Sequence, residues 1–259
     1  MPDYLDTLAR DAKETVMAGY YEVSTQITAS SVSLRKAIME SKRNAIITEV
    51  KAASPSRGII KTSFDPAEVA RAMEKGGATG ISVLTEPKHF NGSLSCIARV
   101  REVVRLPILM KDIIINPLQL ETASRIGANV ILLIEALFER EYCKYSLDEM
   151  ITQAHSRHLE VLLETHSEDE FQSAIETDAD LIGINNRDLR TLKVDLGITE
   201  KILKKHEINE KVVVSESGVM TPADLMFLRG CGAKAYLIGS SIMMADNIET
   251  KVKEFVTAH

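Results

Sequence analysis

The sequence predicts an α/β fold, a (β/α)₈ TIM barrel with an N-terminal helical extension, and three observations support this. The 259 residues, 45% of them hydrophobic, are enough for one barrel, which typically uses about 250 residues. Eight short apolar segments alternate with longer amphipathic stretches. Polar side chains gather where the apolar segments end. We therefore expect a single domain over residues 1–259, with the extension in residues 1–44 and the barrel in residues 45–259.

The apolar segments are predicted to be parallel strands. Their starts lie 21 to 35 residues apart, which leaves room for a loop, a helix and a second loop in each interval. Eight such units close a barrel, whereas five or six would favour an open doubly wound sheet, the structural alternative. The predicted strands are Ala45–Val50, Gly80–Leu84, Pro107–Met110, Val130–Ile134, Glu160–Leu163, Leu181–Ile184, Val212–Val214 and Ala235–Ile238.

Several intervals between the strands carry helix-start signals. Asp65-Pro66, Asn116-Pro117 and Thr221-Pro222 each place a capping side chain before a proline at the first helical position. Gly76 and Gly230 are the expected ends of the first and the last of these helices, because glycine commonly follows a helix.

Residues 1–44 do not follow the strand–helix alternation. Tyr4–Met17 and Ser33–Ser41 are expected to be helices, joined by a polar, β-branched stretch at Ser24–Val32. We interpret them as an extension that covers part of the barrel.

Composition excludes several classes of function. With 31 basic and 37 acidic residues, the net charge of −6 disfavours a nucleic-acid or membrane-surface role, since both need a broad positive field. The cysteines Cys96, Cys143 and Cys231 are far apart and form no CxxC motif, which favours a reduced compartment over a disulfide framework or a zinc site. Residues 1–10 lack the apolar core of a signal peptide, and no apolar run approaches the roughly 20 residues that span a bilayer. We expect a cytoplasmic protein that is a monomer or a weak oligomer.

Charged side chains stand at the predicted carboxyl ends of the strands, which in a barrel face the active-site mouth. Any one of them alone is usually a solvated edge group. Together they predict a site, because a barrel interior holds charges only when they are paired. Glu49 and Lys51 alternate onto one face of the first strand. The other strand-end residues are Thr85, Glu86, Lys111, Asp112, Glu164, Asn185, Asn186, Arg187, Asp188, Ser215 and Glu216.

The last two strand ends have a different composition. Ser217-Gly218 and Gly239-Ser240 offer small residues whose backbone N–H groups can approach an anion. Isolated dipeptides of this kind are mostly ordinary turns. However, barrels often bind phosphate between the loops after strands 7 and 8, so this placement indicates a substrate with a phosphate at one end.

Seven segments, in order over about 200 residues, resemble the motifs of the indole-3-glycerol-phosphate synthase family. They are IITEVKAASPSRG, SVLTEPKHFNGS, PILMKD, GANVILLI, LIGINNRDLRTLKVD, VSESGV and AYLIGSS. The resemblance implies a TIM barrel with an N-terminal extension. It also implies a lyase that converts 1-(2-carboxyphenylamino)-1-deoxyribulose 5-phosphate into indole-3-glycerol phosphate, with loss of carbon dioxide and water, in tryptophan biosynthesis. No metal and no organic cofactor are implied.

The resemblance also implies catalytic roles. Lys111 is expected to protonate the sugar carbonyl, with a pKa lowered by the pocket and by nearby cations. Glu164 and Lys51 are the expected base and acid of the dehydration, although Lys51 could instead serve mainly as the counter-ion of the substrate carboxylate. Glu49 would orient the lysines electrostatically, and Asn185 would hydrogen-bond the intermediates.

The expected binding residues form two groups. Arg187, Glu216, Ser217, Phe90 and Leu132 would bind the organic part of the substrate. The expected phosphate ligands are Ser54, Gly218, Gly239 and Ser240.

The sequence departs from the family pattern at three places. Ile113 replaces the usual aromatic residue after the Lys-Asp pair, which makes one wall of the aromatic pocket aliphatic. Ala52 stands where many members have a second basic residue, and Gly-Ser-Ser replaces Gly-Glu at the last strand.

The first loop of the barrel, Ala52–Thr62, is long and is expected to close over the substrate and exclude water, with Gly58 permitting the bend. A loop that moves without gating is the alternative. Gly58→Pro is expected to change turnover or the Michaelis constant in steady-state kinetics, and unchanged values of both would contradict gating.

Two other functions remain open from the residues alone. A phosphoribosylanthranilate isomerase would also bind phosphate in a barrel, but it usually needs a Cys and Asp pair, and no cysteine falls at a strand end. A non-catalytic metabolite-binding barrel would not require Lys51, Lys111 and Glu164 together, since binding needs no proton donor and acceptor.

Overall fold

Eight parallel strands close into a barrel in the computed structural model, which describes residues 3–24, 26–27, 31–54, 58–59, 64–206, 208 and 211–259. Neighbours in the barrel are neighbours in sequence, and the last strand pairs with the first, with Ala45 beside Ala235. The strands are β1 (Ala45–Val50), β4 (Gly80–Leu84), β5 (Ile108–Lys111), β6 (Val130–Ile134), β7 (Glu160–Thr165), β8 (Leu181–Asn185), β9 (Val212–Glu216) and β10 (Ala235–Ile238). The predicted (β/α)₈ TIM barrel is confirmed, and the open sheet is excluded.

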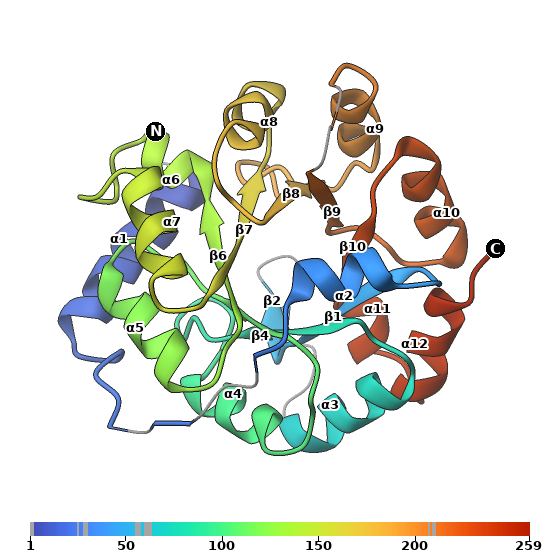
Figure 1. Ribbon diagram of the computed structural model, residues 1–259, viewed down its shortest axis with the longest axis horizontal. Coiled ribbons are helices and arrows are strands. Elements are labelled where there is room, and N and C mark those ends of the chain that lie inside the picture. Colours follow the sequence, from blue (N-terminus) through green and yellow to red (C-terminus); the bar gives the residue numbers. More distant parts are fainter. Residues whose placement is uncertain are drawn as a thin grey trace.

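Helices surround the strands, as Figure 1 shows. The three predicted cap-and-proline starts are confirmed: the side chains of Asp65, Asn116 and Thr221 accept hydrogen bonds from backbone N–H groups in the first helical turn. The helices after β1 are α3 (Pro66–Lys75), α4 (Leu94–Arg101), α5 (Pro117–Arg125), α6 (Glu135–Glu139), α7 (Leu147–His155), α8 (Glu168–Ile175), α9 (Gly197–Leu203), α10 (Pro222–Cys231), α11 (Ser240–Met243) and α12 (Ile248–Val256).

Two glycines are predicted to end helices, and one of these predictions is wrong. Gly76 caps α3 as expected, but α10 continues through Gly230 and ends at Gly232. Gly232 has φ +108°, a left-handed conformation that glycine adopts without steric cost, whereas Gly230 lies inside the helix. The difference between the two glycines is therefore one of backbone conformation, which composition alone does not reveal.

The N-terminal helices lie at opposite ends of the barrel. α1 (Tyr4–Met17) has the predicted bounds, and α2 (Leu34–Glu40) begins after the N-cap Ser33. α2 covers the end where the strands start: Leu34 lies against Gly80, and its N–H donates to Glu160 Oε2 at 2.7 Å. Figure 1 shows α2 across the middle of the ring. Apolar residues of both helices belong to the same hydrophobic cluster as the barrel interior.

On four strands, the side chains that point into the barrel change from apolar to charged at the carboxyl end of the strand. Successive residues of a strand point to opposite faces, so a residue two positions after an interior one is also interior. The last interior apolar residues of four strands are followed in this way by charged ones: Ile47 by Glu49, Leu109 by Lys111, Leu162 by Glu164 and Val214 by Glu216. The four charged side chains therefore point into the interior of the barrel at the carboxyl ends of the strands.

Four strands extend further than the sequence indicates. The structure continues them to Lys111, Thr165, Asn185 and Glu216, where polar residues predict the beginning of loops. Polar character usually marks the end of a strand. Here the polar side chains are largely buried but have hydrogen-bonding partners, and the backbone pairing of the strands continues through these residues.

The first βα loop contains a short hairpin of β2 (Ala53–Ser54) and β3 (Gly58–Ile59), in which Gly58 has φ +65°. Within the loop Ala52–Thr62 that is predicted to close, residues 55–57 and 60–62 lie outside the described residues, and so does the side chain of Ser54. Closure of this loop stays a prediction. Among the helices described, none is both long and apolar enough to cross a bilayer.

Candidate active site

A pocket opens at the carboxyl ends of the strands, with an empty volume of about 1110 Å³, part of it open to solvent. The structure brings nearly all of the predicted site residues to this pocket. Glu216 joins them by contacting the pocket residue Lys111, and Ser54 is the one predicted residue whose side chain is not described. The predicted residues that line the pocket are Glu49, Lys51, Phe90, Lys111, Leu132, Glu164, Asn185, Arg187, Ser217, Gly218, Gly239 and Ser240.

Lys111 is the centre of a buried charge network. Its Nζ lies 2.8 Å from Glu164 Oε2 and 2.9 Å from Glu216 Oε2, so β5, β7 and β9 meet at one ammonium group. Asn185 of β8 donates from Nδ2 to the other oxygen of Glu164 at 3.0 Å. Hydrogen bonds between ionised partners are strong when both are desolvated, so this network holds the four side chains in fixed positions.

The predicted lowering of the Lys111 pKa is wrong for the free protein. Burial does oppose the charge, but the carboxylates of Glu164, Glu216 and Glu49 outweigh it and raise the pKa of Lys111 above its ordinary value. The prediction assumes neighbouring cations, whereas the nearest groups are anions. Lys111 is therefore a protonated ammonium group that has a proton to donate.

The two glutamates that share Lys111 differ in protonation. Despite its burial, the pKa of Glu164 lies well below its usual range because Lys111 and the adjacent His166 stabilise the anion. Burial and the nearby Glu164 raise the pKa of Glu216 to about 7, against the pull of Lys111. When two carboxyl groups share one site, the charge of the first raises the pKa of the second, so the two pKa values move apart. Near neutral pH the network therefore holds one ionised carboxylate and one that gains or loses a proton readily.

A second lysine–glutamate pair lies in the same pocket. Lys51 Nζ is 2.6 Å from Glu49 Oε2, and both side chains are largely buried. A Cβ atom on Gly239 would lie 2.3 Å from that oxygen and 2.8 Å from Lys51 Nζ. Glycine at the end of β10 thus provides the space that the pair occupies.

The two dipeptides predicted to hold phosphate come together on one side of the pocket. Ser217 and Gly218 both have positive φ, +64° and +96°, which turns the chain sharply after β9. Gly239 and Ser240 lie where β10 passes into the short helix α11. The two dipeptides thus line the pocket after the neighbouring strands β9 and β10, in the place where many barrels bind phosphate.

Arg187 lines the pocket from the loop after β8, and hydrogen bonds to residues near it in sequence hold it in that loop. Its backbone N–H donates to Asn185 Oδ1 at 3.0 Å, and its Nη1 donates to the carbonyl of Leu192 at 2.9 Å. The guanidinium group is therefore placed at the rim of the pocket by its own loop.

Sequence reasoning missed the contribution of α1. Tyr4 and Leu8 line the pocket beside Phe90 and Ile113, so the N-terminal helix forms part of its apolar wall. The aliphatic Ile113 is buried in this wall, as the departure from the family pattern indicates. The amphipathic pattern of α1 shows that one face is buried but not against what, so no signal in the sequence identified this contact.

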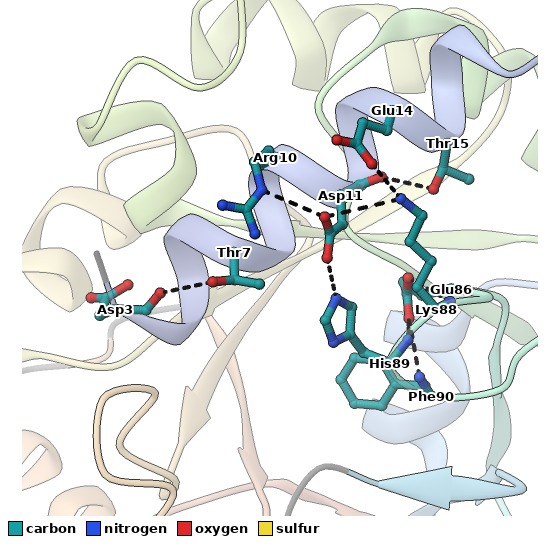
Figure 2. Close-up of polar contacts among 10 residues, drawn as sticks. All are labelled: Asp3, Thr7, Arg10, Asp11, Glu14, Thr15, Glu86, Lys88, His89 and Phe90. Atoms are coloured by element: carbon teal, nitrogen blue, oxygen red, sulfur yellow. Dashed lines mark hydrogen bonds and ion pairs between the residues drawn. The ribbon is translucent and has the colours of Figure 1, made fainter. Parts of the chain in front are cut away.

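Figure 2 shows how α1 is held to the loop after β4. Asp11 lies 2.7 Å from His89 Nε2, and Glu14 lies 2.7 Å from Lys88 Nζ. The buried Glu86 accepts hydrogen bonds from the backbone N–H groups of Lys88, His89 and Phe90 at 2.6 to 3.1 Å. Glu86 therefore shapes the loop that presents the Phe90 ring, and Asp11 fixes the same loop to α1.

The fold and this network define the protein as a (β/α)₈-barrel enzyme with acid–base side chains at the carboxyl ends of its strands. In the part of the chain that the structure describes, no three His, Cys, Asp or Glu side chains are arranged to bind a metal. The family model for indole-3-glycerol phosphate synthase matches residues 5–255, and the chain belongs to that family.

Individual relatives agree with this assignment. An indole-3-glycerol phosphate synthase from Methanocaldococcus jannaschii is 46% identical over 227 residues, 86% of this chain and 82% of the relative. One from Dehalococcoides mccartyi is 37% identical over 257 residues, 98% of this chain and 97% of the relative. Among solved structures, a thiamine phosphate pyrophosphorylase from Pyrococcus furiosus is similar with a TM-score of 0.60 and 16% identity, covering 86% of this chain and 96% of that one. At such low identity, the structural likeness supports the fold alone.

Proposed function

We propose that the chain converts 1-(2-carboxyphenylamino)-1-deoxyribulose 5-phosphate into indole-3-glycerol phosphate, the ring-closing carboxy-lyase step of tryptophan biosynthesis. The observation that carries this proposal at the site is the Lys111 ammonium group between Glu164 and Glu216 inside the barrel. A proton donor and proton acceptors in contact suit a reaction that both protonates and deprotonates its substrate.

Lys111 acts first in this proposal. As the ring carbon that bears the carboxylate attacks the sugar carbonyl carbon, the carbonyl oxygen takes a proton from Lys111 Nζ and becomes a hydroxyl. The carboxylate then leaves as carbon dioxide, and its electron pair restores the aromatic ring. The raised pKa of Lys111 ensures that the proton is present when the substrate binds.

Dehydration follows, and it needs a base and an acid. Glu164, ionised because its pKa is lowered, removes the proton from the adjacent carbon. Lys51 protonates the departing hydroxyl, which leaves as water, and Glu49 orients the Lys51 ammonium group at 2.6 Å. Asn185 keeps Glu164 in place through its hydrogen bond, and Glu216 hydrogen-bonds a sugar hydroxyl.

The remaining residues of the pocket bind the two ends of the substrate. Backbone N–H groups at Ser217, Gly218, Gly239 and Ser240, with Ser54, hold the phosphate. Phe90, Leu132 and Ile113 contact the aromatic ring, and Arg187 orients the substrate carboxylate through its guanidinium group.

One assay tests the activity and the role of Lys111. The chain is incubated with the anilino-deoxyribulose phosphate, and indole fluorescence is followed. We expect product formation by the natural sequence, and a fall in kcat of about 10²- to 10⁴-fold in Lys111→Ala, the usual contribution of a general acid. Lys36→Ala is the matched control and should turn over normally, because the Lys36 side chain is exposed on α2 at the other end of the barrel.

Other outcomes of the assay separate the alternatives. Normal turnover by Lys111→Ala contradicts its assigned role. Isomerase activity without indole formation would indicate a phosphoribosylanthranilate isomerase, and tight binding without product would indicate a non-catalytic barrel.

A further inference from the structure

His166 is a buried side chain that the proposed mechanism does not use. It follows β7 directly, and its ring lies between two carboxylates: Nε2 is 3.2 Å from Glu164 Oε1, and Nδ1 is 3.5 Å from Glu170 Oε2. Only 12% of its side chain is exposed. Among the described residues, neither ring nitrogen makes a hydrogen bond of regular geometry, so the two carboxylates are its polar surroundings.

These surroundings suit one protonation state of the ring. Ionised carboxylates only accept hydrogen bonds, whereas a neutral imidazole has one N–H and one lone pair. In the neutral form one nitrogen lone pair would therefore face a carboxylate in a buried place, which is unfavourable. The imidazolium form has an N–H toward each. Burial opposes the charge, but Glu164 and Glu170 outweigh it and raise the pKa of His166 to about 9.

Both carboxylates are held in position independently of the ring. Glu170 accepts the backbone N–H of His166 at 2.8 Å, and its own N–H is bound by Ser167 Oγ at the start of α8. From α6, the buried Glu135 adds a further acidic group, and Glu170 contributes to raising its pKa. The acidic groups around the ring thus come from β7 (Glu164), α8 (Glu170) and, next to Glu170, α6 (Glu135), while Lys111 lies on the far side of Glu164.

Glu164 has two oxygens with different partners. Oε2 is paired with Lys111, while Oε1 receives Asn185 and faces His166. When Lys111 gives its proton to the substrate it becomes a neutral amine, and Glu164 loses the cation on Oε2. A second cation near Oε1 stabilises the ionised carboxylate at that moment, which weakens the competition of Glu164 with the substrate for the Lys111 proton.

We propose that His166 is a positioning residue: it remains an imidazolium that holds Glu164 in place and ionised while Lys111 protonates the substrate. This inference rests on the proposed function. His166 does not line the pocket and touches no substrate in this arrangement, so it acts through Glu164.

Kinetics over a range of pH test the proposal. His166→Gln keeps a side chain of similar length with an N–H donor but removes the charge, so the pKa of Glu164 should rise. We expect kcat to fall about tenfold on the acid limb of the profile, at pH values below the pKa of Glu164, where a one-unit rise in that pKa has its full effect. The acid limb of the kcat profile should move to higher pH, while KM stays within about twofold because substrate contacts are intact. Glu170→Gln should instead move the alkaline limb to lower pH.

The matched control comes from the helix that precedes the same strand. His155 on α7 forms a comparable pair with Asp180, 2.9 Å apart, and neither residue lines the pocket. His155→Gln should therefore leave both limbs of the profile unchanged. A wild-type profile in His166→Gln would overturn the proposal.

A second measurement does not depend on the variant folding. Nitrogen NMR of the His166 ring in the natural sequence should show both nitrogens protonated at pH 7.5, and a neutral tautomer would overturn the inference. If the natural sequence forms no indole product, the proposed function fails by itself, and the NMR experiment still decides the charge of His166.

Discussion

Two glycines, Gly183 and Gly239, leave the space that the carboxylates of Glu216 and Glu49 occupy. At Gly183 a Cβ atom would lie 2.3 Å from Glu216 Oε1, and at Gly239 it would lie 2.3 Å from Glu49 Oε2. Neither glycine has a positive φ, so the requirement at both positions is for space and not for backbone conformation. Each glutamate occupies the volume that a side chain on the adjacent strand would fill.

Gly183→Ala is expected to reduce both activity and stability. The added methyl group must push the Glu216 carboxylate away from Lys111, which breaks one of the two ion pairs of that lysine. We expect kcat to fall at least tenfold and the free energy of unfolding to drop by about 1–3 kcal/mol, the usual cost of overpacking. Steady-state kinetics and denaturant unfolding measure both.

Gly230→Ala is the matched control. Gly230 lies within α10, and no atom lies within 4 Å of the place that an added methyl group would take. Alanine should therefore raise stability by about 0.5–1 kcal/mol without affecting turnover. Full activity in Gly183→Ala would show that the contact between Glu216 and Lys111 is dispensable.

At the scale of elements, α1 and the loop after β4 form one wall of the pocket. Tyr4 and Leu8 come from the helix and Phe90 from the loop, and the two are joined by Asp11 and His89. The Tyr4 and His89 rings also pack edge to face, with their centroids 5.7 Å apart. The position of Phe90 therefore depends on a helix that lies far earlier in the chain.

Asp11→Ala is expected to weaken substrate binding while leaving the chemical step intact. Without the carboxylate, His89 loses its partner and the wall loosens. We expect KM to rise about fivefold, equivalent to roughly 1 kcal/mol, with kcat within about twofold. Glu14→Ala removes the neighbouring, more exposed pair with Lys88 and should change KM little. Equal effects of the two substitutions on KM would contradict a specific role for Asp11.

At the scale of the whole molecule, stability and chemistry are separated along the barrel axis. The charged network occupies the carboxyl ends of the strands, whereas α2 closes the opposite end through buried apolar residues. Leu34 is 1% exposed and packs against the start of β4. Barrels generally divide their two ends in this way.

Leu34→Ala should therefore lower stability without lowering turnover. A buried leucine replaced by alanine costs about 2–5 kcal/mol, and the cavity would form far from the reacting groups. Met39→Ala, on the same helix but 60% exposed, should cost less than about 0.5 kcal/mol. Thermal or denaturant unfolding and kcat are measured for both. A loss of kcat in folded Leu34→Ala would show that the two ends are coupled.

Much of the fold and the site could be predicted because the relevant signals are local. Apolar runs, cap-and-proline pairs and the alternation that places Glu49 and Lys51 on one face all follow from residues a few positions apart. The positions of Lys111, Glu164, Asn185 and Glu216 at strand ends follow from the same pattern, since parallel strands of a barrel all end at one mouth. The sequence by itself thus determined which strand-end residues meet at the mouth of the barrel.

Only the tertiary structure decided what those residues do to one another. The pKa of Lys111 depends on Glu164 and Glu216, which are 53 and 105 residues away in sequence, and the sign of the shift follows from their distances of 2.8 and 2.9 Å. Desolvation and Coulomb energies depend on separation in space, and no local pattern contains that separation. The same reason explains why the place of α1 in the pocket wall and the position of His166 between two carboxylates emerged from the folded chain alone.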